Sequence, residues 1–327
     1  DNTSAYGNAL MRRSDYSDVI VAAHRSEDLY AEQKVTMADG KTGTMICEVK
    51  EVSGELREFL YYIPDSAVQN KNGAPLITVW AGGSQTSIIF MDSTCWWETA
   101  NANGVALAFA AEHYNTSVAV TPAECDACYK HMISTMKAWD EEGKFDIDFT
   151  RVYSTGQSMG SMESQQFAQE TPEYYAAVAS TSFFQAYPDT QSGKSIPTYF
   201  LNGEGNGKDD TGTAYDDRWN RTDEWHQYFL TVNGFEYQNP EYDANGNMTK
   251  LGVPISEPVK TVSGDYNRFE TYTWYDENQV PLVQYTNSLY RPHNCLTTEI
   301  PMMWDYLEHF SSVVAEDGTV TRYYSAS

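Results

Sequence analysis

Gly156-Gln157-Ser158-Met159-Gly160 is the segment whose residue types most directly predict chemistry. It has the pattern G-x-S-x-G and stands between the strand-like segment RVYST and the helix-like segment SMESQQ. A sharp strand-to-helix turn strains the serine backbone, and side chains at the two glycine positions would clash there. The sequence therefore predicts that Ser158 is a nucleophile whose hydroxyl stands clear of a sheet.

A serine hydroxyl needs a general base, and histidine is the usual one. When the order along the chain is serine, acid, histidine, three of the six histidines come late enough: His226, His293 and His309. His226 and His309 lie in segments with helical periodicity, which gives both an ordinary structural role. His293 lies in a loop between the last strand-like and the last helix-like segment. We expect His293 to be the base.

The acid that orients the imidazole should follow the strand-like segment IPTYFLNG. Three carboxylates stand there, and we rank Asp209 first, Glu204 second and Asp210 third. The two oxyanion donors are expected to be the backbone N–H groups of Met159 and Gly83, since no side chain obstructs a ligand at a glycine. Trp96, Trp97 and Gln157 are expected to bind substrate, because flat aromatic faces suit sugar rings, aromatic acids or polyester chains.

Strand-like and helix-like segments alternate from residue 57 to residue 203, which favours an α/β fold with a mostly parallel central sheet and helices on both faces. Residues 1–44 are interpreted as an N-terminal arm packed on the body. Residues 45–327 are interpreted as one catalytic domain, with an irregular insertion at about 235–265 before the last strands. A final helix from about residue 298 is expected to place Met303, Leu307 and Phe310 on one face.

Composition limits the partners. A net charge of −25 repels phosphate backbones and anionic lipid, so nucleic acid is not expected as a partner. The longest apolar run, GVALAFAA, is far shorter than a membrane span.

Five cysteines leave at least one thiol free. Cys125 and Cys128 form a CxxC pair, which is expected in a surface loop or a local disulfide. No metal or other cofactor is expected.

Several segments together resemble the polyhydroxybutyrate depolymerase, feruloyl esterase and acetylxylan esterase group of α/β-hydrolases. They are VWAGGSQ, WWETANANGVALAFAAE, DIDFTRVYSTGQSMGSM, IPTYFLNG, and PHN followed by IPMMWDYLEHF. The resemblance covers residues 45 to 312 and implies secreted or extracellular serine esterases that act on polyesters or plant cell-wall esters without a cofactor. It also implies a disulfide near Cys295, for which Cys95 is a candidate partner.

Two positions depart from the pattern of that group. Ala81 stands where the oxyanion strand usually ends in histidine, and Asn206 stands where the acid often lies. The sequence thus predicts an esterase that forms an acyl-enzyme on a small-molecule or polymeric ester. A serine peptidase of the same fold and a hydrolase fold kept as a non-catalytic binding module are the alternatives.

Overall fold

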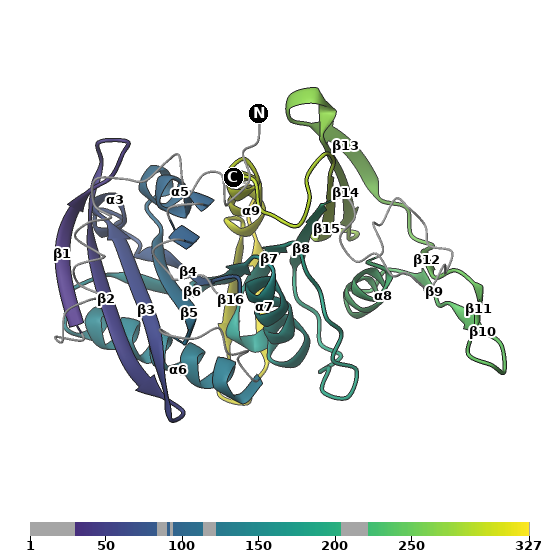
Figure 1. Cartoon of the computed structure of the whole chain (residues 1–327), viewed down its shortest axis with the longest axis horizontal. Helices are drawn as coiled ribbons and strands as arrows, with labels where there is room; N and C mark the ends of the chain where they lie inside the picture. Colours follow the sequence, from purple (N-terminus) through teal and green to yellow (C-terminus); the bar gives the residue numbers. More distant parts are fainter. Residues whose placement is uncertain (1–29, 84–89, 92–93, 114–121, 204–221, 327) are drawn as a thin grey trace.

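The protein is described from a computed structural model, which describes residues 30–83, 90–91, 94–113, 122–203 and 222–326. Eleven of the described strands form one sheet in the order β1-β2-β3-β5-β4-β6-β7-β8-β15-β14-β13. In Figure 1 this sheet crosses the molecule from β1 at the left to β13 at the right. The strands are β1 (Tyr30–Thr36), β2 (Thr42–Val52), β3 (Glu55–Pro64), β4 (Ala74–Trp80), β5 (Ala106–His113), β6 (Ile147–Gly156), β7 (Ala177–Thr181), β8 (Thr198–Gly203), β13 (Val259–Ser263), β14 (Phe269–Tyr275) and β15 (Pro281–Ser288).

The middle of the sheet is parallel. Neighbours from β5 through β4, β6, β7 and β8 to β15 all pair in parallel. The strands outside this block pair antiparallel at both ends of the sheet. The prediction of an α/β fold with a mostly parallel central sheet is confirmed. Because parallel strands end at one edge, the loops that follow β4, β6, β7, β8 and β15 gather there.

Helices cover both faces of the sheet. Alternate side chains of β4 enter opposite layers, with Ile77 and Val79 in one buried cluster and Leu76 and Trp80 in the other. The first cluster contains residues of α5 (Trp96–Asn103) and α9 (Glu299–Leu307). The second contains residues of α6 (Pro122–Glu141), α7 (Met159–Glu170) and α8 (Asp223–Val232). The remaining helical turns are α3 (Asp65–Val68), η1 (Pro172–Tyr174) and η3 (Asp265–Asn267).

The segments expected as arm and insertion have regular structure in the part described. β1 and the start of β2 extend the main sheet, so the expected boundary at residue 45 falls inside β2. Residues 235–265 contain short strands that form two small two-stranded sheets, and β13, which joins the main sheet. The short strands are β9 (Tyr237–Gln238), β10 (Glu241–Tyr242), β11 (Met248–Lys250) and β12 (Val253–Pro254), and they extend beyond the sheet in Figure 1.

The C-terminal segment differs from the prediction. The last helix ends at Leu307, and Phe310 begins a hairpin of β16 (Phe310–Val314) and β17 (Val320–Tyr324). Phe310 still joins the buried cluster of Met303 and Leu307, so the hydrophobic spacing was right and the element was wrong. His309 consequently lies after the helix, where Nδ1 contacts the Ser325 carbonyl at 2.7 Å.

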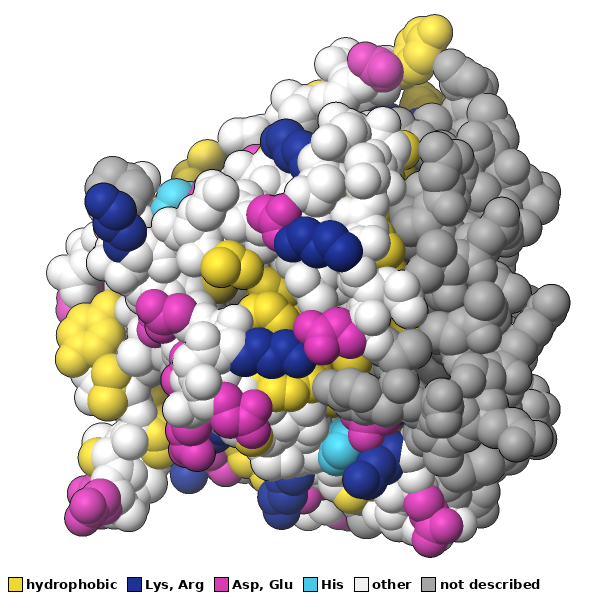
Figure 2. Space-filling view, turned by 90° about the vertical axis from the view of Figure 1, so that its left-hand side faces the viewer, with side chains coloured by type: hydrophobic (Ala, Val, Ile, Leu, Met, Phe, Trp, Pro, Cys, Tyr) yellow, Lys and Arg dark blue, Asp and Glu magenta, His cyan; other side chains and the backbone are white. Residues whose placement is uncertain are grey.

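Opposite charges lie next to one another on the described surface near β1. Lys144 pairs with Glu32 at 2.9 Å, and Lys34 pairs with Asp65. Figure 2 shows acidic side chains interleaved with lysines and arginines on the described part of this face, where no large area of one sign forms. Within the described residues, no helix is both long and apolar enough to cross a membrane.

Candidate active site

Ser158 lies at the turn between β6 and α7, in strained backbone geometry. Its φ is 58° and its ψ is −118°, which an L-residue adopts only at a cost in free energy. A Cβ on Gly160 would lie 1.9 Å from the Trp80 carbonyl oxygen, and one on Gly156 would lie 2.3 Å from the Gly160 carbonyl carbon. Only glycine fits at either position, which agrees with the steric reason for expecting them.

The structure brings Ser158 and His293 together. Ser158 Oγ lies 2.7 Å from His293 Nε2, although the two residues are 135 positions apart in the chain. The Ser158 N–H donates to the Thr181 carbonyl at 3.1 Å, which fixes the turn on the end of β7. Partial loss of hydration lowers the pKa of His293, the positive charge of Arg291 lowers it further, and a hydrogen bond with the Ser182 backbone raises it. Below its usual range, that pKa leaves the imidazole neutral at pH 7.

The other late histidines have different surroundings. His226 lies in α8 and is fully buried, with Nδ1 at 2.8 Å from the Thr222 carbonyl and its ring against Tyr285. His309 contacts the C-terminal hairpin. These contacts hold the two rings in other parts of the fold, whereas Ser158 Oγ contacts His293.

The two expected oxyanion donors come from different parts of the chain. Met159 is the first residue of α7, so its N–H has no acceptor within the helix. Gly83 is partly exposed and follows β4, a direct neighbour of β6 in the sheet. The acid candidates Glu204, Asp209 and Asp210 lie outside the described residues.

Trp96 and Trp97 are corrections to the expected substrate contacts. Both belong to α5, and their side chains are 1% and 3% exposed in the core. They belong to the buried cluster that also contains Ile300 and Met303 of α9, so they do not present a face to a substrate. Gln157 is 1% exposed, and neither polar atom of its amide has a hydrogen-bond partner within the described structure. The amide is therefore buried beneath the turn and does not face open solvent.

The cysteines also differ from expectation. None of the five forms a disulfide, and all are buried. Cys125 and Cys128 lie on α6, so the CxxC pair is part of a helix and not of a surface loop. Burial raises the pKa of both thiols, and that of Cys295, which keeps them protonated at neutral pH. Among the described residues, no group of three or more histidines, cysteines and carboxylates could hold a metal ion.

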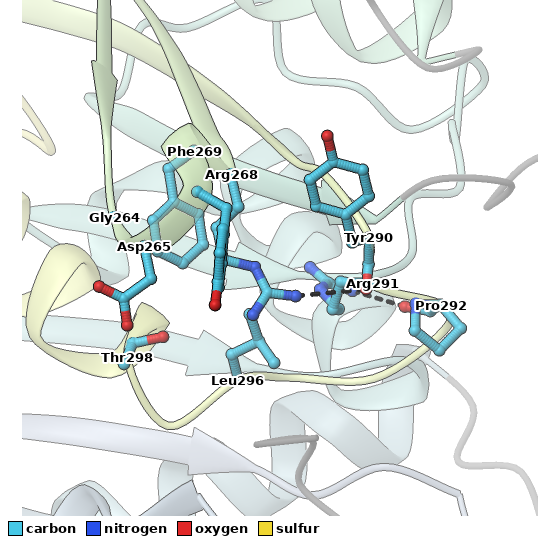
Figure 3. A pocket seen from close by; sticks show the side chains of 10 residues that line it. Gly264, Asp265, Arg268, Phe269, Tyr290, Arg291, Pro292, Leu296 and Thr298 are labelled. Carbon is cyan, nitrogen blue, oxygen red and sulfur yellow. Dashed lines mark hydrogen bonds between the residues drawn. The ribbon is translucent and has the colours of Figure 1, made fainter. Parts of the chain in front are cut away.

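A cavity of about 720 Å³ lies beside the loop that carries His293. Figure 3 shows Arg268 extending toward the segment of Tyr290, Arg291 and Pro292, with Phe269 and Asp265 on the opposite wall. Arg268 Nη2 donates to the Leu289 and Tyr290 carbonyls at 3.3 and 3.2 Å. Tyr266 and Tyr290 line this cavity and are 93% and 68% exposed.

Several partners of this loop were not anticipated from the sequence. Arg291, Glu299, Thr181 and Ser182 surround it with buried polar contacts. Arg291 and Glu299 stand two before and six after His293, but that spacing of charges also occurs in solvated loops. Only the fold shows that both side chains point inward.

Comparisons with protein-family models and with curated proteins find no match. Solved structures do match. The acetyl xylan esterase from Aspergillus awamori has a TM-score of 0.52 and 14% sequence identity, over 85% of this chain and 99% of that one. An S-formylglutathione hydrolase from Agrobacterium tumefaciens has a TM-score of 0.40 and 13% identity, over 54% of this chain and 80% of that one. A feruloyl esterase module from Clostridium thermocellum, solved as an S954A mutant complexed with sinapinate, has a TM-score of 0.38 and 11% identity, over 59% and 75%.

At these identities the likeness concerns the fold. The first match has a TM-score of 0.52 and covers 85% of this chain and 99% of the other. The chain therefore has the fold of the α/β-hydrolase esterases.

Proposed function

We propose that this protein is a serine hydrolase of carboxylic esters. The observation that carries the proposal is the 2.7 Å contact between Ser158 Oγ and His293 Nε2, at a strained strand-to-helix turn. A serine hydroxyl paired with a neutral imidazole is an activated nucleophile. The fold, which matches that of an acetyl xylan esterase, supports the same reaction class by analogy.

The reaction follows from the positions of these groups. His293 Nε2 takes the Oγ proton while Oγ bonds to the ester carbonyl carbon, and the carbonyl oxygen becomes an oxyanion. The N–H groups of Met159 and Gly83 would stabilise that charge. The imidazolium then gives its proton to the leaving alcohol as the C–O bond breaks. Water, activated by the same imidazole, attacks the acyl-enzyme and releases the acid, which returns Ser158 to its starting state.

An acid from the loop after β8 would complete the site. Our first choice is Asp209, followed by Glu204 and Asp210. The location is supported by the end of β8: a Cβ on Gly203 would lie 2.4 Å from the Arg291 carbonyl oxygen and 2.6 Å from that of Pro292. The chain that leaves Gly203 therefore starts in contact with the segment just before His293.

The substrate is proposed to be a polyester or a plant cell-wall ester. Exposed tyrosine rings at the cavity beside His293 support a ligand with a flat or extended apolar part. A volume of about 720 Å³ is within the range of small-molecule sites. A peptidase of this fold and a binding module without activity are the other outcomes that the following test distinguishes.

The test compares hydrolysis of acetyl, feruloyl and hydroxybutyrate chromogenic esters with that of a proline amide. We expect ester turnover and no amide turnover, with Ser158→Ala and His293→Ala each losing about 10³-fold or more and the double variant little further. Tyr266→Ala and Tyr290→Ala should lower kcat/KM for the bulky esters but not for the acetyl ester. Tyr242→Ala, on the distant β10, is the control. Turnover that survives Ser158→Ala would contradict the proposal.

A further inference from the structure

Two residues close to His293 in the sequence, Arg291 and Glu299, form an ion pair with no exposure to solvent. Arg291 Nη2 is 2.7 Å from Glu299 Oε1, and both side chains are 0% exposed. Two charges lose their hydration when buried, and a well-packed apolar pair of similar volume is often at least as stable. Fold stability alone therefore does not account for the pair, and its contacts indicate what else it does.

Arg291 donates hydrogen bonds to backbone carbonyls of the loop that carries His293. Its Nη1 donates to the carbonyls of Pro292, at 3.1 Å, and Asn294, the residues on either side of His293. The same nitrogen donates to Ser182 Oγ, which itself donates to the Asn294 carbonyl. One guanidinium thus binds backbone carbonyls of the residues immediately before and after the histidine.

Glu299 accepts hydrogen bonds from residues at both ends of this loop. From the first turn of α9 its carboxylate accepts hydrogen bonds from Ser288 Oγ at 2.7 Å and from the Leu296 N–H. Ser288 is the last residue of β15, so the carboxylate joins the strand before the loop to the helix after it. The loop is therefore tied at its start, middle and end by one pair of charges.

The same pair is linked to the turn of Ser158 through Thr181. Arg291 Nη2 donates to Thr181 Oγ1 at 2.9 Å, while the Thr181 carbonyl accepts the Ser158 N–H at 3.1 Å. Ser182, whose φ is 80°, donates its own N–H to Leu201 of β8 at 2.9 Å. The end of β7 is thus a common attachment for the serine turn and the histidine loop.

We propose that Arg291 and Glu299 are positioning residues for His293: the hydrogen bonds of the buried pair hold the loop so that the imidazole lies against Ser158. This inference rests on the proposed function for the role of His293. It assigns the pair a part in setting both the distance and the protonation state of the base.

The charges near His293 agree with this role. Arg291 lowers the pKa of His293, second only to desolvation. The other described titratable groups that face the pair are Tyr199 of β8, Tyr285 of β15 and Cys295 of the loop, and burial raises the pKa of each, so all three are neutral at pH 7. Arg291 and Glu299 carry opposite charges, so removing one or the other should move the pKa of His293 in opposite directions.

The test is an NMR titration of the His293 imidazole in the full chain, with His293→Ala used for assignment. Arg291→Met leaves the Glu299 carboxylate unopposed, which favours the imidazolium and should raise the pKa of His293 by about half a unit or more. Glu299→Gln leaves the Arg291 charge unopposed and should lower it. The double variant should lie between the two. Arg268→Met, which removes another arginine bound to carbonyls of this loop, should leave the titration unchanged.

Activity supplies the second measurement. Arg291→Lys keeps the charge but loses the two-nitrogen fork, so we expect an unchanged titration with kcat about tenfold lower and KM little altered. If Arg291→Met does not fold, Arg291→Lys and Glu299→Gln still decide. The proposal is overturned if His293 titrates at the wild-type pH in Arg291→Met and Glu299→Gln and Arg291→Lys keeps full kcat. The titration does not depend on turnover, so failure of the proposed function, seen as activity in Ser158→Ala, is a separate result.

Discussion

At the scale of single residues, the environment of His293 sets the pH at which the site can act. Neutral imidazole is the form that accepts the Ser158 proton, and partial desolvation together with Arg291 disfavours the protonated form. The pKa of His293 therefore lies below its ordinary value of 6.5. The base stays competent to lower pH than a histidine in water would.

The resulting prediction concerns the acid limb of kcat/KM. Activity should fall as pH drops through the lowered pKa, so the apparent pKa of that limb should be below about 6.5. Chromogenic ester hydrolysis between pH 4 and 9 measures it, with His309→Gln as a control that should leave the profile unchanged. An acid limb at about 7 or above, or one that moves in His309→Gln, would disagree with this assignment.

At the scale of elements, the turn between β6 and α7 depends on the absence of a side chain at residue 160. A Cβ there would be 1.9 Å from the Trp80 carbonyl oxygen, and that atom belongs to the rigid central strand β4. The turn can accommodate a methyl group only if the nucleophile or the strand moves. Either movement would separate Ser158 from His293.

Gly160→Ala is therefore expected to lose most ester hydrolysis and to destabilise the fold by about 1–3 kcal/mol or more. Urea unfolding and steady-state kinetics measure the two effects. Gly246→Ala is the matched control: its φ is 81° but nothing lies within 4 Å of the added Cβ, so it should cost about 1 kcal/mol and leave activity intact. Equal behaviour of the two variants would show that the turn tolerates a Cβ at residue 160, which contradicts this account.

The loop after β8 carries the third catalytic group in our account. A carboxylate that holds the imidazole tautomer loses up to about 10⁴-fold in kcat when changed to its amide, whereas a solvated acid loses almost nothing. We expect Asp209→Asn to be severe and Glu204→Gln and Asp210→Asn to be mild, as measured by kcat. A different severe variant would transfer the role to that residue, and three mild ones would remove the acid from this loop.

Local patterns in the sequence predicted the parts of the site that depend on local geometry. G-x-S-x-G between a strand and a helix gave the Ser158 turn, and a loop position before the last helix gave His293. Burial of Trp96 and Trp97 could not be foreseen, because it depends on α9 packing over α5 from 200 residues away. The hairpin that begins at Phe310 was missed because residues 303, 307 and 310 keep helical spacing across the helix end.

At the scale of the whole molecule, the C-terminal hairpin is hydrogen-bonded to the region around η1. Arg322 of β17 donates to the carbonyls of Ser195 at 2.9 Å, Pro172 at 2.6 Å and Tyr175 at 3.1 Å. Burial lowers the pKa of Arg322 to about 10, so it still carries its charge at neutral pH. Arg322, close to the C-terminal end of the described residues, is thus hydrogen-bonded to a segment 150 positions earlier.

Arg322→Met should lower stability by about 1–3 kcal/mol, because buried carbonyls lose their donor. Activity measured well below the melting temperature should be unchanged, since these contacts do not touch the Ser158 turn. Thermal unfolding followed by circular dichroism gives the stability, and Lys194→Met, an exposed change nearby, is the control. Loss of activity in a folded Arg322→Met variant would mean that the hairpin acts on the site.

The central claim is that His293 activates Ser158, and covalent labelling tests it most directly. The protein is treated with a fluorophosphonate, and the adduct is located by peptide mass spectrometry. We predict one adduct, on Ser158, with none in Ser158→Ala and a labelling rate at least about 10³-fold lower in His293→Ala. An adduct on another residue, or equally fast labelling in His293→Ala, would contradict the account.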